Sequence, residues 1–149
     1  MSDGTKPRGQ FVISNHSQYN LATWAQGINA KTLNGCRRTV PMALTHPCDV
    51  NGDQKGDLLL TGGAGWVTIP VGLSGGTGGF SDVNSVVSEF PIWARDPLAK
   101  AVSADFNNDG RPDIALVGGN EYVGSPRWTV PLAYSNANGT FTVTNFPIN

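Results

Sequence analysis

Short apolar runs, separated by polar and glycine-rich stretches, set the pattern of this chain. The clearest runs lie at residues 58–63, 68–74 and 114–119. Val, Ile, Thr, Leu and Phe in the runs favour strands, and Gly, Asn, Asp and Pro between them favour turns. No long window shows the 3.6-residue apolar period of a helix, and only residues 93–100 suit a single helical turn. The pattern therefore predicts an all-β protein.

The runs recur in the same order further along the chain, which indicates internal repeats. Three pairs correspond: LLLTGG (58–63) with IALVGG (114–119), TIPVGLS (68–74) with TVPLAYS (129–135), and FSDVN (80–84) with FTVTN (141–145). The chain thus holds two full repeats of about 60 residues, each with three or four short strands separated by turn signals.

A degenerate partial repeat precedes the two full ones. TWAQGINAKTL (23–33) matches IWARDPLAKAV (92–102), and residues 11–15 and 39–45 are similar to the other runs. We therefore expect a flexible polar lead-in followed by a single β-repeat domain. The expected boundaries are 1–10 for the lead-in and 11–149 for the domain, divided into a partial repeat 11–48 and full repeats 49–104 and 105–149.

Each full repeat opens with an acidic loop, DVNGDQKGD (49–57) in the first and DFNNDGRPD (105–113) in the second. Crowding three carboxylates into nine residues costs free energy unless a cation offsets the repulsion. Oxygen-bearing side chains occupy positions 1, 3, 5 and 9, and position 7 offers its backbone carbonyl. The candidate ligands are Asp49, Asn51, Asp53, Lys55 and Asp57 in the first loop and Asp105, Asn107, Asp109, Arg111 and Asp113 in the second.

These oxygens suit Ca²⁺, which takes about six to eight hard oxygen ligands in flexible geometry, better than they suit Mg²⁺ or Zn²⁺. A plain Asp/Gly turn is the alternative, and two copies with the same spacing favour the metal. The loops are not EF-hands, because position 12 holds Leu60 or Leu116 in place of Glu. Gln54 stands where the second loop has Gly110, so we expect a more strained turn and weaker binding in the first loop.

Charge and composition exclude several functions. A net charge of −1 provides no basic field for nucleic acid or an anionic membrane, and no apolar run is long enough to span a membrane. The glycine-rich stretch 72–79 lacks the Lys-Ser/Thr of a P-loop and predicts a hairpin turn. Since no catalytic triad motif is recognisable either, we expect no enzyme.

The D-x-N-x-D-x-x-x-D loop followed by an apolar strand resembles the calcium loops of FG-GAP or VCBS-type repeats, as in the integrin α-chain β-propeller. DFNNDGRPDIALVGG, TIPVGLS and GGFSDVN are similar in style to the repeats of Psathyrella-type fungal lectins and related bacterial proteins. The resemblance covers residues 49–145, and 11–45 weakly. It implies propeller-like blades, bound Ca²⁺, an extracellular location and a glycan partner.

Four tryptophans stand out in so polar a chain. Trp24 and Trp93 share one repeat position, which favours packing in the core. Trp66 and Trp128 follow glycine-rich or inserted loops, where an aromatic ring can stack on a sugar, although core packing is the alternative for them too. The candidate ligand-binding residues are Trp66, Trp128, Tyr122 and Arg127, the last two from an insertion at 119–127.

Cys36 and Cys48 are the only cysteines. In an extracellular protein we expect them to form a disulfide. Two free thiols or a redox pair are the alternatives, although the spacing is not C-x-x-C.

The first functional expectation is a calcium-stabilised carbohydrate-binding protein, and the alternative is a structural or adhesive calcium-binding protein that binds copies of itself. Propellers have about four to eight blades, and this chain has little more than two. Residues 23–33 look like a spare copy of a strand that the last repeat lacks. We therefore expect a homo-oligomer, three chains in a ring or a filament, with a fragment of a longer propeller as the alternative.

Overall fold

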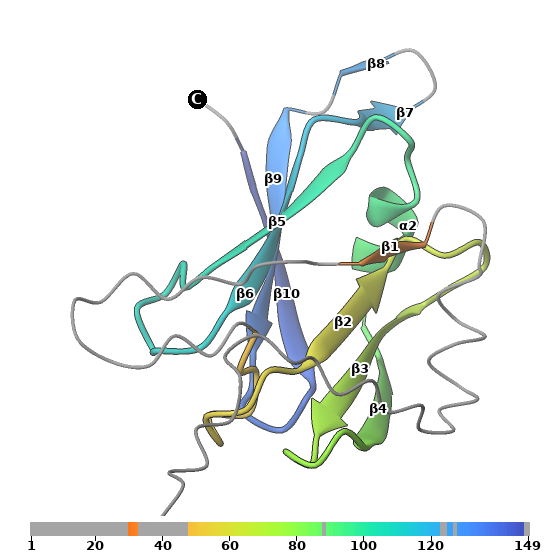
Figure 1. The fold of residues 1–149 in the computed structure, drawn as a ribbon. Coiled ribbons are helices and arrows are strands. Elements are labelled where there is room, and N and C mark those ends of the chain that lie inside the picture. Colours follow the sequence, from red (N-terminus) through yellow and green to blue (C-terminus); the bar gives the residue numbers. More distant parts are fainter. Residues whose placement is uncertain (1–29, 33–47, 88, 123–124, 127, 148–149) are drawn as a thin grey trace, which may run out of the picture.

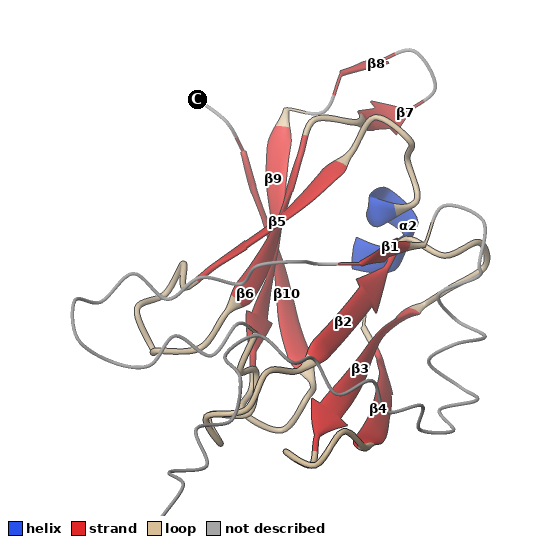
Figure 2. Cartoon of the chain, in the orientation of Figure 1, coloured by secondary structure: helices blue, strands red, loops and turns tan. Residues whose placement is uncertain are grey.

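The computed structural model describes residues 30–32, 48–87, 89–122, 125–126 and 128–147. These residues form two four-stranded antiparallel sheets, a two-stranded hairpin and one short helix (Figures 1 and 2). The all-β fold expected from the sequence is confirmed, and each sheet has the size and strand order of a propeller blade. Among the described residues, no helix is long and apolar enough to cross a membrane.

Each sheet is a simple meander. The first sheet, called blade 1, consists of β1 (Lys31–Thr32), β2 (Leu58–Thr61), β3 (Thr68–Ser74) and β4 (Phe80–Val86) in that order. The second, called blade 2, consists of β5 (Lys100–Ala104), β6 (Asp113–Val117), β9 (Thr129–Ser135) and β10 (Phe141–Pro147). The insertion in the second repeat forms a small hairpin of β7 (Asn120–Tyr122) and β8 (Ser125–Pro126), and the helix α2 (Phe90–Ala94) lies between the blades in sequence.

The Pro-centred runs form the central strands β3 and β9, which is unusual because proline cannot donate to a strand ladder. The register explains why it is tolerated. β2 pairs with β3 only through Leu58 and Leu59, opposite Gly72 and Val71, so Pro70 lies just beyond that ladder. In blade 2, Pro131 holds the same place relative to β6. Both prolines are fully buried and act as packing residues.

Each sheet begins one strand earlier in the chain than the corresponding sequence repeat, because its first strand precedes the acidic loop. Lys31 and Thr32 precede the first acidic loop, yet they pair with Thr61 and Leu60 of β2, and β5 pairs with β6 in the same way in blade 2. The expectation that residues 23–33 supply a spare strand is therefore wrong, since Lys31–Thr32 already serves as the first strand of blade 1. Both blades have four strands from this chain, so strand exchange is not needed to complete them.

The core lies between the two blades. Ile69, Val71 and Leu73 of β3 share one side of blade 1, called its forward face, and their register partners on β2 and β4 share it. The opposite side of each sheet is its rear face, to which Ala133 and Ser135 of β9 belong. The core joins the forward face of blade 1 to the rear face of blade 2 and comprises Cys48, Val50, Leu59, Ile69, Val71, Val87, Phe90, Ala94, Ile114, Leu116, Ala133 and Phe141.

Two polar contacts fix this stacking. The Ser135 hydroxyl of blade 2 donates a buried hydrogen bond of 2.7 Å to the Val50 carbonyl in the loop before blade 1 strand β2. The Lys31 ammonium, on the forward face of blade 1, donates to the carbonyls of Ala94 and Asp96 at the end of α2. A cation at a helix C-terminus meets carbonyls that have no partner within the helix.

Helix α2 is one turn long, but it lies at Phe90–Ala94 and overlaps the predicted 93–100 only at Trp93 and Ala94. Pro91 is tolerated in its first turn, and Pro97 disfavours helical geometry in the residue before it. Phe90 and Ala94 are fully buried in the core between the blades, whereas Ile92 is 45% exposed.

We predict that Phe90→Ala lowers the free energy of unfolding by about 3–5 kcal/mol, because it leaves a cavity in the core between the blades. Ile92→Ala, in the same helix turn but exposed, should change it by about 0.5 kcal/mol or less. Thermal and urea unfolding followed by circular dichroism measures both. Equal effects of the two substitutions would contradict the position of the core.

Candidate functional site

The loops of the two blades gather at two opposite edges (Figure 1). The acidic loops lead into β2 and β6, and the turns at 75–79 and 136–140 leave β3 and β9 at the same edge. The other edge carries the loop before β3, with Trp66, and the inserted hairpin followed by Trp128. The candidate metal ligands and the candidate ligand-binding aromatics therefore lie on different edges of the blades.

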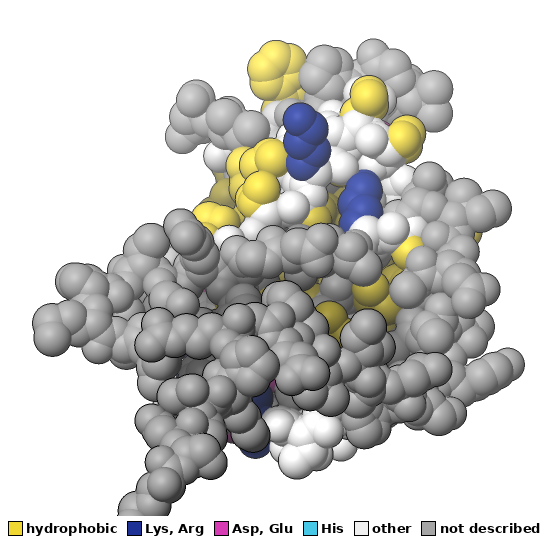
Figure 3. Space-filling view, in the orientation of Figure 1, with side chains coloured by type: hydrophobic (Ala, Val, Ile, Leu, Met, Phe, Trp, Pro, Cys, Tyr) yellow, Lys and Arg dark blue, Asp and Glu magenta, His cyan; other side chains and the backbone are white. Residues whose placement is uncertain are grey.

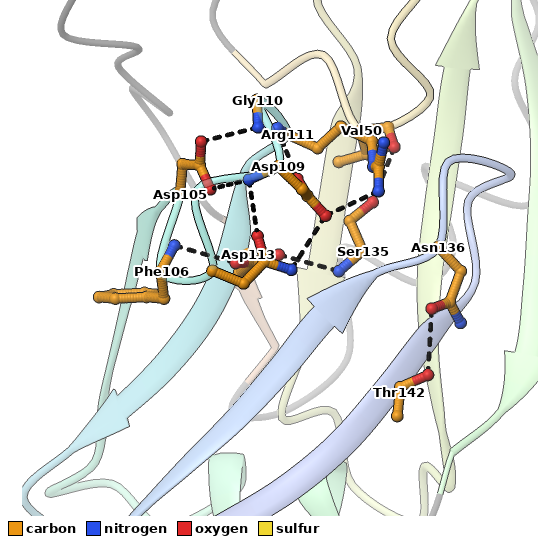
Figure 4. Close-up of polar contacts among 11 residues, drawn as sticks. Val50, Asp105, Phe106, Asp109, Gly110, Arg111, Asp113, Ser135, Asn136 and Thr142 are labelled. Carbon is orange, nitrogen blue, oxygen red and sulfur yellow. Dashed lines mark hydrogen bonds and ion pairs between the residues drawn. The ribbon is translucent and has the colours of Figure 1, made fainter.

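The first aspartate of each acidic loop organises the turn from within. The Asp49 carboxylate accepts the backbone N–H groups of Gly52 and Gln54, at 2.7 and 2.8 Å. In the second loop, Asp105 accepts the N–H groups of Asp109 and Gly110, at 3.0 and 2.8 Å (Figure 4). The two loops thus fold in nearly the same way, as their shared spacing predicts.

The aspartate at position 5 of each loop pairs with the basic residue two places on. Asp53 accepts the Lys55 ammonium at 2.7 Å, and Asp109 accepts the Arg111 guanidinium at 2.7 Å. The hydrogen bond from Lys55 lowers the pKa of the Asp53 carboxyl. Because the Lys55–Asp53 pair is largely exposed, its own contribution to stability is small. A positive charge nevertheless balances this carboxylate in each loop.

The last aspartate of each loop is buried and joins the loop to the central strand. Asp57 accepts the N–H groups of Val50 at 3.0 Å and Ser74 at 2.9 Å, one on each carboxylate oxygen. Asp113 accepts those of Phe106 and Ser135 at the same two distances.

Burial raises the pKa of both carboxyls, Asp57 and Asp113, against the opposing effect of these hydrogen bonds. The charged form of each carboxyl is therefore disfavoured by its poorly solvated surroundings.

Two backbone positions in each loop are left-handed. In the first loop these are Gly52 at φ 80° and Gln54 at φ 68°, and in the second loop Asn108 at φ 61° and Gly110 at φ 85°. Asn tolerates this region better than most side chains, and Gln does not share that tolerance. The expected strain at Gln54 is confirmed.

The donor chemistry of the loops fits a hard cation such as Ca²⁺, since every candidate ligand is a carboxylate, amide or carbonyl oxygen. Within the described residues, however, no group of three or more His, Cys, Asp or Glu side chains is assembled to hold a metal. The carboxylates instead accept N–H groups of their own loop and the cations of Lys55 and Arg111. A bound metal ion would replace Lys55 and Arg111 as the positive charge beside Asp53 and Asp109.

The two candidate tryptophans lie in different surroundings. The Trp66 indole is folded onto Gly63, so closely that a Cβ on Gly63 would lie 2.2 Å from the ring. One side of its ring is thus occupied. Trp128 is 68% exposed, at the start of β9 beside the inserted hairpin. Trp93 packs against the core between the blades, as expected from its repeat position.

Several of the predicted residues lie wholly or partly outside the described residues. Arg127 and Trp24 lie outside the described residues, and the structure places the backbone but not the side chain of Tyr122. Cys48 is disulfide-bonded, and Cys36, the other cysteine of the chain, lies outside the described residues.

Sequence reasoning missed the role of Ser74 and Ser135. Their backbone N–H groups hold the buried carboxylates, and the Ser135 hydroxyl also connects the two blades. The sequence did contain a sign of this role, because both Pro-centred runs end in a serine at the same repeat position.

The comparisons with known proteins support the fold assignment. The family model described as FG-GAP-like repeat matches residues 49–116, from the start of the first acidic loop through the second loop into β6. This match covers less than half of the chain, and the two four-stranded sheets are consistent with the β-sheet blades of such repeats. No curated protein and no solved structure matches the chain.

We predict that Gln54→Gly raises the free energy of unfolding by up to about 1 kcal/mol, because glycine relieves the left-handed strain and offsets its own entropy cost. Gln54→Ala removes the same side chain but keeps the strain, so it is the control. Gly110→Gln should destabilise the second loop. A Gln54→Ala variant as stable as Gln54→Gly would show that the side chain, not the backbone, sets the effect.

Proposed function

We propose that this protein is a calcium-stabilised carbohydrate-binding protein built from β-propeller repeats and working outside the cell. The observation that carries the sugar-binding proposal is the exposure of Trp128 beside an inserted hairpin at the edge away from the acidic loops. The family whose model matches residues 49–116 is typically extracellular and generally non-enzymatic, so we propose no catalytic role.

The acidic loops support the calcium part of the proposal. Burial raises the pKa of the Asp57 and Asp113 carboxyls, and a nearby cation would favour their charged form. The oxygens of positions 1, 3, 5 and 9 and the carbonyl of position 7 are the ligands we propose in each loop. Ca²⁺ would supply positive charge that holds the loop closed.

Ca²⁺ on these loops would stabilise the scaffold without touching the sugar. Asp57 reaches Ser74, and Asp113 reaches Ser135, so each loop braces the end of a central strand. A loop fixed by an ion therefore also fixes the sheet that carries the opposite edge.

Trp128 offers the features of a sugar-stacking residue. Its large apolar face is open to solvent, and the adjoining hairpin supplies polar groups such as the backbone of Asn120 and Glu121. Apolar faces of sugars pack on aromatic rings, and nearby polar groups orient the hydroxyls. Trp66 is a weaker partner because Gly63 occupies one side of its ring.

A structural or adhesive role without sugar binding is the second candidate. The observation that favours it is the set of exposed apolar side chains on blade 2, which includes Val102, Val117 and Phe146. Exposed apolar surface of this kind marks protein interfaces.

We predict that Ca²⁺ raises the melting temperature and that a chelator lowers it. A ligand that binds only the folded state at a hundredfold excess over Kd adds about 2.7 kcal/mol. Asp109→Ala should remove most of the contribution of the second loop, and Asp82→Ala, an exposed acid outside the loops, should leave the calcium response intact. Calorimetry with and without chelator measures this. Identical melting curves in chelator and Ca²⁺, with no metal detected in the purified protein, would refute the calcium proposal.

We predict that Trp128→Ala weakens glycan binding without unfolding the protein, because one aromatic stacking contact is worth about 1–3 kcal/mol by analogy with base stacking. Trp66→Ala should weaken it less. Leu98→Ala, which removes a similarly exposed apolar side chain, is the control. Glycan arrays identify the sugar, and titration calorimetry measures the affinity. Undiminished binding by both tryptophan variants would place the site elsewhere, and no binding on the array would favour the structural role.

A further inference from the structure

The turn at residues 136–140, which joins β9 to β10 at the edge of the acidic loops, carries a tripeptide that has no role so far. Asn138, Gly139 and Thr140 form the sequence Asn-x-Ser/Thr, whose asparagine accepts an N-linked oligosaccharide in secreted proteins when x is not proline. Asn15 begins a second such sequence but lies outside the described residues. Because so short a sequence also occurs by chance, the surroundings of Asn138 decide whether the residue is a site.

The Asn138 side chain is exposed and is held by its oxygen. The side-chain carbonyl oxygen accepts the Thr140 backbone N–H at 3.0 Å and the Thr140 hydroxyl at 2.6 Å. Among the described residues, no group is hydrogen-bonded to the amide nitrogen of Asn138. The turn therefore presents the nitrogen, which is the atom that becomes glycosylated.

The Thr140 hydroxyl is itself held in place by its neighbours. The Asn136 side-chain amide donates to this hydroxyl at 3.2 Å. The Thr142 hydroxyl in turn donates to the Asn136 side-chain oxygen at 3.0 Å (Figure 4). The Asn136 backbone N–H closes the turn by donating to the Thr140 carbonyl at 3.0 Å. The hydroxyl two places after Asn138 therefore has a fixed direction toward it.

Gly139, the middle residue of the tripeptide, anchors the turn on blade 1. It is buried at φ 80°, and a Cβ at this position would lie 3.2 Å from the Cβ of Val83 in β4. Gly139 thus faces the protein while the exposed Asn138 beside it faces solvent. An oligosaccharide on Asn138 would displace no packed group.

The place of the turn also suits a bulky attached group. It lies at the edge opposite Trp128 and the inserted hairpin (Figure 1). Figure 3 shows hydrophobic side chains gathered over β9 and β5, toward that opposite edge. An attached oligosaccharide, which is bulky and solubilising, would therefore leave the proposed sugar-binding edge open.

We propose that Asn138 is an N-glycosylation site. The donor is an oligosaccharide linked through a diphosphate to a polyprenyl lipid. The Asn138 amide nitrogen forms a bond to the anomeric carbon, the bond from that carbon to the diphosphate breaks, and the lipid diphosphate leaves as the nitrogen loses a proton. The proposal rests on the extracellular location proposed above, because the secretory route supplies this donor, but not on calcium or on sugar binding.

The turn at residues 75–79 of blade 1 has the same shape without the sequence. The Gly75 backbone N–H donates to the Gly79 carbonyl at 2.8 Å, and the second and fourth residues of both turns are left-handed. Thr77 occupies the place of Asn138 and is exposed, and a Cβ at Gly79 would meet no atom within 4 Å. Two substitutions therefore transfer the tripeptide to this turn.

The experiment produces the full chain behind a cleavable signal peptide in eukaryotic cells, and mass spectrometry of the peptides locates any attached oligosaccharide. The wild-type chain should carry one on Asn138, and Thr140→Ser should keep it. Asn138→Gln and Thr140→Ala should lose it while retaining the wild-type circular dichroism spectrum. Asn136→Gln, in the same turn but without Ser or Thr two places on, is the control and should keep it.

The double substitution Thr77→Asn with Gly79→Thr should add an oligosaccharide to the blade 1 turn, whereas Thr77→Asn alone should not. A wild-type chain with unmodified Asn138 would overturn the proposal, and so would modification that persists in Thr140→Ala. An unmodified double variant would overturn the role given to the shape of the turn. Cell extract and medium are both measured, so a failure of secretion is distinguished from a failure of the site.

Discussion

The fold depends on one constraint: a four-stranded sheet whose central strand is apolar on both sides has to be covered on both sides. β3 meets the constraint, because Ile69 and Val71 pack toward blade 2 and Pro70 is buried on the other side. A single blade of this kind could not bury enough apolar surface alone. Stacking of the two blades therefore creates the core, with the loop residue Val50 and helix residue Phe90 filling its margins.

The buried carboxylates link that core to the acidic loops. Asp57 and Asp113 each hold the start of their loop and the end of a central strand with one carboxylate. An interaction that stabilises an acidic loop therefore also holds the end of the central strand in its register. This connection explains why two carboxyl groups with raised pKa values lie at the border of the core. It also separates the roles of the two edges, since the loops brace the sheets while the opposite edge presents Trp128.

The inserted hairpin makes one blade differ from the other without changing the order of its strands. β7 and β8 lengthen only the connection between β6 and β9, so the ladder of blade 2 keeps the strand order of blade 1. An insertion at a blade edge leaves the packing between blades unchanged and adds new surface. The same edge in blade 1 is short and is closed by Trp66 folded onto Gly63.

The sequence by itself determined the strands, the repeats and the acidic loops, because these depend on local periodicity and turn chemistry. TIPVGLS and TVPLAYS form β3 and β9 over the residues the pattern indicates, and Gln54 is left-handed as Gly110 predicts. Only the tertiary structure decided how the strands are grouped. Lys31–Thr32 belongs to the first blade because it pairs with β2 across a long sequence separation, and no local signal marks such a pairing. The burial of Asp57 and Asp113 and the difference in exposure between Val50 and Phe106 likewise depend on which faces meet in space.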